Sequence, residues 1–453
     1  MIASQSVNLD LVEWLLKSGA DTDVLDYIDA SALYYVIRDG CVDVVAALLK
    51  KGARIGVAHV SGEEHILFHA MSHPEIVLLL LDYGADPNLA NSTGNMAINM
   101  ASSSGNVEVA RMLIRKGADI NHNDAYGWAP IFDVVGYSEN VAFTRLLAEN
   151  GAKMEGMAGG DTLLHLALGR DLEILTALLE FRKNIDINAL NKDGFTALHN
   201  IVLQRDIKYL QALIRAGADL NTPGPDGETP LHSAAAEGEA IDHLKLLVAQ
   251  PDIDLDKLCS SLGSPLCIAS AKLNVEGVQA LLDRSADVNI AIPNILLSTP
   301  LILVLSTFGC TTRSKDILTI DVITRMLVFN SPNKANVKQT LRGGRFHTAL
   351  AAACISAGPA TLKFLVEEGA EVHLADTVSG RLPQHFAAAN GIDNFQAIAL
   401  SYRSDLMASD KEQKNCLHWA SQFGNLQAVE FIISRLSDDE RLAHYINRPD
   451  SDG

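Results

Sequence analysis

Residues 226–235 read Asp226-Gly227-Glu228-Thr229-Pro230-Leu231-His232-Ser233-Ala234-Ala235, and altered copies of the Thr-Pro-Leu-His core recur along the chain. These copies begin at Ser31, Met96, Ala129, Thr162, Thr196, Ser264, Thr299, Thr348, Leu382 and Asn415. A second landmark, Gly-Ala and a following residue, keeps step with them and begins at Gly19, Gly52, Gly84, Gly117, Gly151, Gly217 and Gly369. The first five of these glycines are separated by 33, 32, 33 and 34 residues, so one unit is repeated throughout.

Each landmark has a physical role. Thr229 suits a helix N-cap and Pro230 the first helical position, where no backbone N–H is needed. Apolar pairs such as Leu178-Leu179 fall on one face of a second helix. Gly217 suits the left-handed position that closes this helix, so we expect a positive φ there. Segments such as Asn221–Gly227 are rich in turn formers, and the unit is therefore turn, short helix, tight connection and longer helix.

This motif and period resemble the ankyrin repeat family, and the resemblance covers essentially the whole chain. It implies an all-α fold, an ankyrin-repeat solenoid of stacked helix-turn-helix units with β-turn or hairpin tips. We expect about twelve units in one continuous domain, residues 1–453. The approximate boundaries are 1–25, 26–58, 59–90, 91–123, 124–157, 158–190, 191–223, 224–257, 258–291, 292–341, 342–376, 377–409, 410–447 and the start of a further unit at 448–453.

Two stretches lengthen the repeat. Between Ser285 and Gly369 there are 84 residues where two units need about 66. The extra chain is expected within 309–341, where it is either a tolerated insertion or a loop that marks a binding face. The second longer stretch is 437–447, where we expect a second helix that is extended and exposed to solvent.

The two ends lack the polar caps that a solenoid needs. Residues 8–16 already belong to a second helix, and residues 448–453 form the turn that introduces another unit. We therefore expect the chain to be an excerpt of a longer protein, with a short natural protein whose terminal repeats have eroded as the alternative.

Charge and cysteine usage limit the partners and the compartment. The chain has 36 basic and 55 acidic residues, a formal net charge of -19, which argues against nucleic acid or an anionic membrane as the main partner. Six cysteines without paired spacing indicate reduced thiols in the cytoplasm, with the nucleus as the other compartment. The uncharged stretch Val288–Thr312 is long enough to span a membrane, but Pro293 and an in-phase Thr299-Pro300 helix start favour buried solenoid helix.

Motifs of catalysis and cofactor binding are missing. The sequence has no P-loop, no Gly-x-Gly-x-x-Gly, no His-Glu-x-x-His and no Cys-x-x-Cys. His65, His69 and His73 have helical spacing for a metal site, but Pro74 interrupts the helix after them. We therefore expect no enzyme activity, no cofactor and no metal. The resemblance assigns a structural role to the histidines at the fourth motif position, which are His165, His199, His232, His385 and His418.

The resemblance implies recognition of other proteins by the turn tips and first helices, which together form a concave groove. The candidate aromatic contacts at these positions are Tyr126, Trp128, Phe132 and Phe195, because exposed aromatic residues dominate interface energetics. The candidate rim residues are Arg170, Arg205, Glu228 and Glu237. The alternative is that these aromatic side chains pack against neighbouring tips.

We predict a non-enzymatic scaffold that docks a partner protein in this groove. The alternative is an array that selects substrates or senses a ligand for a catalytic or signalling domain outside this chain. Such a parent protein would be an NTPase-type sensor, a channel, a toxin or a ubiquitin-ligase adaptor. Partner identity and oligomeric state do not follow from the sequence.

Overall fold

The computed structural model describes residues 8–55, 65–91, 93–124, 126–202, 206–260, 263–290, 292, 299–306, 321–326, 335–338, 347–401, 404–436 and 442–451. Within these ranges the regular structure is helical, with no strand and three isolated β-bridges at turn tips. The predicted all-α solenoid of paired helices is confirmed. By contacts the chain divides into two compact units: unit 1 holds residues 1–197 and 208–218, and unit 2 holds 198–207 and 219–453.

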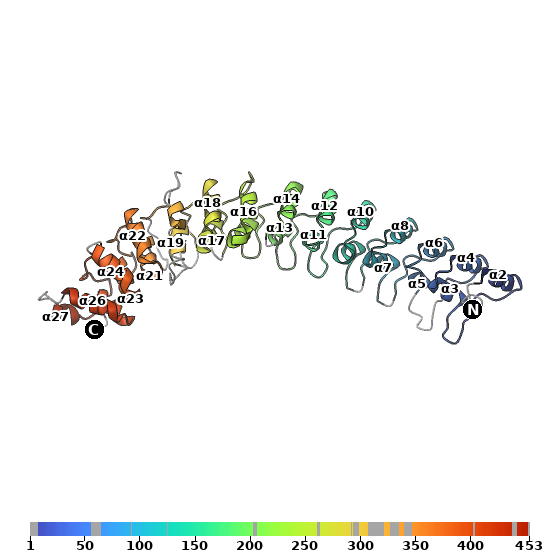
Figure 1. The fold of residues 1–453 in the computed structure, drawn as a ribbon, viewed down its shortest axis with the longest axis horizontal. Helices are drawn as coiled ribbons and strands as arrows, with labels where there is room; N and C mark the ends of the chain where they lie inside the picture. The colour runs from blue at the N-terminus through green and yellow to red at the C-terminus, as the bar shows by residue number, and fades with distance from the viewer. Residues whose placement is uncertain are drawn as a thin grey trace. The chain divides into compact units, whose positions relative to one another are not determined.

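Unit 1 consists of two layers of helices (Figure 1). The layer of second helices contains α2 (Leu9–Lys17), α4 (Val42–Lys50), α6 (Pro74–Asp82), α8 (Val107–Arg115), α10 (Val141–Glu149), α12 (Leu172–Glu180) and α14 (Ile207–Ala216). The layer of first helices contains α3 (Ala32–Arg38), α5 (Ile66–His69), α7 (Ala97–Ser104), α9 (Pro130–Asp133) with the π-helical turn η1 (Val134–Ser138), and α11 (Leu163–Ala167). The short 3-10 turn η2 (Arg182–Asn184) follows α12. The turn tips project beyond the layer of first helices.

Unit 2 repeats this arrangement. Its first helices are α13 (Ala197–Ile201), α15 (Pro230–Ala236), α17 (Pro265–Ala271), α19 (Pro300–Ser306), α21 (Ala349–Ser356), α23 (Pro383–Asn390) and α25 (Cys416–Gln422). Its second helices are α16 (Ile241–Val248), which follows the 3-10 turn η3 (Gly238–Ala240), α18 (Val275–Asp283), α22 (Pro359–Glu367), α24 (Ile392–Ser401) and α26 (Leu426–Leu436), with α27 (Leu442–Ile446) beyond them. Consecutive first helices pack together from α15 to α25.

Five motif histidines join their own first helix to the next tip. The Nδ1 atom of His232 accepts a hydrogen bond from the Thr229 N–H at 3.0 Å, and its Nε2 atom lies 3.0 Å from the carbonyl oxygen of Gly263 in the following tip. The same 3.0 Å contact recurs in the pairs His165–Phe195, His199–Glu228, His385–Ala408 and His418–Arg448. The structural role that the resemblance implied for these histidines is confirmed.

A second set of polar contacts joins the same loop of successive repeats. The Asn88 side-chain oxygen accepts the Asp119 N–H at 2.7 Å, and 2.8 Å contacts of the same kind join Asn121 to Lys153 and Asn221 to Asp254. In each of these hydrogen bonds, a side chain of one repeat pairs with a backbone N–H group of the next repeat. Each repeat therefore depends on the next for its polar contacts as well as its apolar ones.

Glycine closes the second helices as expected. Gly217 has a φ of +93°, and Gly117 and Gly151 both have +86°. A Cβ atom added at Gly217 would meet no other atom within 4 Å, so backbone conformation alone explains the glycine.

Two expectations lie largely outside the described residues. Of the 309–341 insertion, only 321–326 and 335–338 are described, and of the 437–447 lengthening only α27 and Asn447 are described. Part of the uncharged stretch Val288–Thr312, which is long enough to span a membrane, is described. There Thr299-Pro300 starts α19, whose residues Leu301–Leu305 are buried. No helix within the described ranges is both long and apolar enough to cross a membrane.

Candidate functional site

The tip before α9 presents two of the predicted aromatic residues. One carboxylate oxygen of Asp124 accepts the backbone N–H groups of Tyr126 and Trp128, both at 2.8 Å, which closes the turn. Tyr126 is 85% exposed, while Trp128 is half-buried. Their different exposure shows that only one of the two is a purely surface aromatic.

Trp128 is held against its own repeat. Its ring stacks on Tyr137 with a centroid distance of 5.3 Å and an interplanar angle of 26°. A Cβ atom at Gly136 would lie 3.1 Å from the indole, so the missing side chain there allows the close approach. The other edge of the indole reaches the next tip, where a Cβ at Gly159 would lie 3.7 Å away. Trp128 therefore packs against a neighbouring tip and is half-buried, and its role as a partner contact stays a prediction.

The π-helical turn η1 positions Tyr137, the ring on which Trp128 stacks. It continues α9 directly, so Asp133 and Tyr137 belong to one helical segment. Tyr137 is 66% exposed. Single π-turns within helices are frequent at functional sites.

These side chains border a cavity of about 380 Å³ between two successive repeats of unit 1. Its lining comes from the tip before α7, from α7, from the tip before α9, from α9 and from η1, and consists of Asn95, Asn99, Met100, Ser103, Asp124, Tyr126, Trp128, Asp133 and Tyr137. The volume is in the range of ligand-binding pockets, roughly 300 to 1,000 Å³. The cavity therefore has room for a side chain of a bound partner.

Asp133 is the chemically unusual member of the lining. It is only 6% exposed, and burial together with the nearby Asp124 carboxylate raises its pKa to about 7, although a hydrogen bond from Asn99 acts in the opposite direction. None of the lining residues is basic. The cavity thus combines aromatic faces with carboxylates and has no cation of its own.

The prediction that Phe132 is exposed was wrong. Its side chain is 5% exposed. It occupies the fourth position of the motif copy that begins at Ala129, where His232 is 1% exposed in its own repeat. This position faces the next repeat, so an apolar ring there is buried as core.

The other predicted contacts lie outside the cavity lining. Arg170 is exposed and pairs with Glu139 at 2.6 Å, whereas Phe195 is half-buried and its carbonyl oxygen is bound by His165. Glu228 and Glu237 belong to unit 2, the former half-buried and the latter exposed. Arg205 is outside the described residues. A partner-binding role for these five residues stays a prediction.

Asn99, Asp133 and Tyr137 were not among the predicted contacts. A signal was present, because the two repeats that border the cavity carry Asn99 and Phe132 where the motif has histidine. A glycine inside a first helix, Gly136, was a second sign of close packing.

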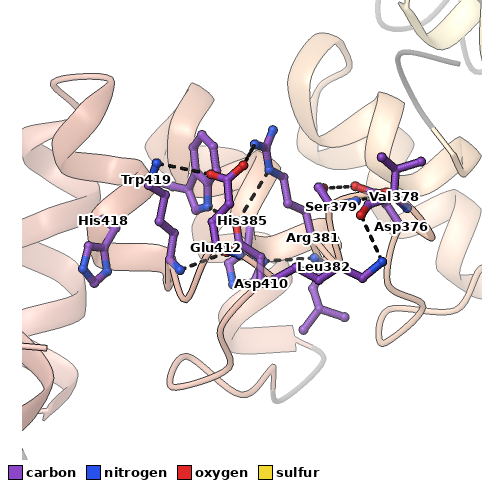
Figure 2. Close-up of polar contacts among 12 residues, drawn as sticks. Asp376, Val378, Ser379, Arg381, Leu382, His385, Asp410, Glu412, His418 and Trp419 are labelled. Atoms are coloured by element: carbon purple, nitrogen blue, oxygen red, sulfur yellow. Dashed lines mark hydrogen bonds and ion pairs between the residues drawn. The ribbon is translucent and has the colours of Figure 1, made fainter. Parts of the chain in front are cut away.

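A buried polar network occupies the tips of unit 2 (Figure 2). The Asp410 carboxylate accepts the N–H groups of Glu412 and Lys414 at 2.9 Å and the indole N–H of Trp419 at 3.0 Å. The Arg381 guanidinium lies 3.9 Å from the centre of the Trp419 ring, and its Nε atom is 3.7 Å from Asp410. The contacts join neighbouring tips of unit 2, and among the described residues the buried Arg381 Nε–H has no hydrogen-bond acceptor. We assign this network to stability.

The three histidines considered as metal ligands have separate positions. His65 precedes α5, His69 ends it and lies against Tyr34, and His73 precedes α6, which begins at Pro74. In the part of the chain that the structure describes, no group of three or more His, Cys, Asp or Glu residues is placed to hold a metal ion.

The comparisons with known proteins agree with the repeat geometry. The model of ankyrin repeats (3 copies) matches residues 1–91, 65–158, 136–223, 206–292 and 323–441. This chain belongs to the ankyrin repeat family. The array is 24% identical over 458 residues to the human transient receptor potential cation channel subfamily A member 1, covering 96% of this chain and 39% of that protein.

Other relatives match over shorter stretches. The mouse B-cell lymphoma 3 protein homolog is 32% identical over 120 residues, covering 25% of this chain and 27% of that protein. The E3 ubiquitin-protein ligase KEG of Arabidopsis thaliana is 25% identical over 260 residues, covering 52% and 16%. The crystal structure of the human ASB11 ankyrin repeat domain matches with a TM-score of 0.40 at 23% identity, covering 48% of this chain and 96% of that one. The ankyrin array spans less than half the length of the curated relatives named here.

Proposed function

We propose that the ankyrin array is a non-enzymatic scaffold that binds a partner protein through the groove of tips and first helices in unit 1. The observation that carries this proposal is the cavity between α7 and η1, with Tyr126 and Tyr137 exposed beside it. Exposed tyrosines beside a half-buried tryptophan are typical of binding hot spots. Ankyrin repeats are generally protein-interaction modules, which makes this surface a reasonable docking site.

Affinity capture tests the proposal. The bait is the full chain, compared with a Tyr126→Ala/Tyr137→Ala variant and analysed by mass spectrometry of bound proteins. We expect a partner retained by the wild type to be reduced at least roughly tenfold on the variant, because a hot-spot aromatic contributes 2 kcal/mol or more. Circular dichroism should be unchanged because both rings are largely exposed.

The matched control removes two exposed apolar side chains from α6 and its C-cap. Leu78→Ala/Tyr83→Ala truncates side chains of residues that are 40% and 47% exposed on a second helix of the same unit. This variant should retain the partner. Equal capture by the wild type and the tyrosine variant would contradict the location of the groove, and Trp128→Ala/Phe195→Ala would then test the tips alone.

The alternative function is a substrate-selecting or ligand-sensing array within a larger protein. It is favoured by one observation: the relatives that match here include a cation channel and a ubiquitin ligase, and they are much longer than this chain. Mapping and sequencing the complete parent transcript tests it. An open reading frame that encodes a channel, ligase or NTPase domain beside the array would establish this function, and one without any further domain would overturn it.

We also propose a cytoplasmic setting, with the nucleus as the other compartment, and neither nucleic acid nor membrane as the main partner. The proposal is supported by the net charge of -19 and by the free thiols of Cys41, Cys259, Cys267, Cys354 and Cys416.

A further inference from the structure

The cavity in unit 1 has an unbalanced charge. Asp124 and Asp133 both line it, and none of its lining residues is basic. Asp124 already uses one oxygen for the N–H groups of the tip. Asp133 is bound by the Asn99 amide, yet a carboxylate offers about four acceptor sites. Among the described residues, these hydrogen bonds leave acceptor capacity on the two carboxylates for an incoming cation.

The aromatic part of the lining suits the same kind of ligand. Trp128 and Tyr137 are stacked at 5.3 Å, and Tyr126 extends from the tip beside them. Aromatic faces attract cations through the quadrupole of the ring, most strongly for tryptophan. A planar guanidinium can stack on such a face and bind a carboxylate with two parallel hydrogen bonds, which an ammonium group cannot do.

We propose that this cavity binds an arginine side chain presented by an extended segment of the partner protein. The inference rests on the proposed function and names the chemistry that its groove recognises. The guanidinium stacks on the Trp128–Tyr137 pair and donates hydrogen bonds to Asp133, with Asp124 adding electrostatic attraction. The acidic balance of the whole chain attracts such a basic segment at long range.

A peptide titration of the full chain tests this inference. The probe is a dye-labelled glycine-serine peptide with one central arginine, followed by fluorescence anisotropy at pH 8, where the Asp133 carboxyl is ionised. The matched peptide carries citrulline, which has the shape of arginine without its charge. We expect the arginine peptide to bind roughly tenfold or more tightly than the citrulline peptide, as charge-assisted hydrogen bonds and cation–π contacts require.

Two variants place the binding in the cavity. Asp133→Asn should weaken binding of the arginine peptide roughly tenfold, because a neutral amide has no charge and only one oxygen to accept the guanidinium N–H groups. Asp43→Asn, an exposed position on α4 of the same unit, should leave its affinity unchanged. Equal affinity for the two peptides, no binding of either, or full affinity of Asp133→Asn would overturn the inference.

Failure of this inference is distinguishable from failure of the proposed function. Suppose that capture of a partner depends on Tyr126 and Tyr137 but the chain binds the arginine and citrulline peptides equally. The proposed scaffold function would then stand, and the inference of an arginine ligand would be wrong. Binding of the peptide without any captured partner would keep the site and leave the scaffold unsupported.

Discussion

Asp410→Ala is expected to lower the free energy of unfolding by about 3 kcal/mol or more. The carboxylate side chain is fully buried and accepts hydrogen bonds from two backbone N–H groups and from the Trp419 indole, beside the Arg381 guanidinium. Removing one partner of a buried charged network leaves the others desolvated and unpaired, which costs about 3 to 5 kcal/mol. Urea unfolding followed by tryptophan fluorescence measures the loss, with Trp419 as the local reporter.

Two further variants separate the causes. Asp410→Asn keeps an oxygen for the backbone N–H groups but sets an amide donor against the Trp419 donor, so it should lose less than Asp410→Ala. Asp124→Ala removes the equivalent tip carboxylate in unit 1, which accepts the backbone N–H groups of Tyr126 and Trp128, and should cost about 1 kcal/mol. A loss below about 1 kcal/mol for Asp410→Ala would show that the network of Figure 2 contributes little.

Asp133→Asn is expected to stabilise the protein at pH 8 and to have little effect near pH 4. The pKa of Asp133 is raised from 3.8 to about 7 by burial and by Asp124, so the folded state holds a proton that the unfolded state has released. The stability that Asp133 contributes is therefore complete below pH 4 and is lost as the pH rises to about 7.

The size of this effect follows from the shift. Three pKa units correspond to about 4 kcal/mol, and because the cavity admits solvent, screening reduces the expected difference to about 2 kcal/mol. The measurement is the difference in urea midpoint between variant and wild type at pH 4.5 and at pH 8, which cancels the other titrating groups. A difference that stays constant between the two pH values would contradict the raised pKa of Asp133.

The sequence predicts the scaffold well because each repeat encodes its own local structure. Thr229 and Pro230 set the start of a helix, and Gly217 the end of one, through interactions within a few residues. Recurrence of the unit along the chain then makes an error in a single repeat unimportant. The stacked helix pairs and the turn tips followed from these local rules, whereas the role of the motif histidines was implied by the resemblance to ankyrin repeats.

The candidate site was less predictable because it depends on contacts between repeats. Phe132 was expected on the surface by its place in a first helix, but its motif position faces the next repeat and buries it. Tyr137 was missed because a π-turn, which the sequence pattern does not reveal, determines its direction. The position of the Trp128 ring depends on Gly136, where an added Cβ would lie 3.1 Å from the indole.

Hydrogen–deuterium exchange on the complex with the captured partner tests the central claim most directly, because it locates the bound surface without a mutation. We expect slower exchange in residues 95–104 and 126–138, which form the cavity wall in unit 1. Slower exchange confined to the second helices, or to repeats of unit 2, would show that the partner binds elsewhere and would contradict the assignment of this groove.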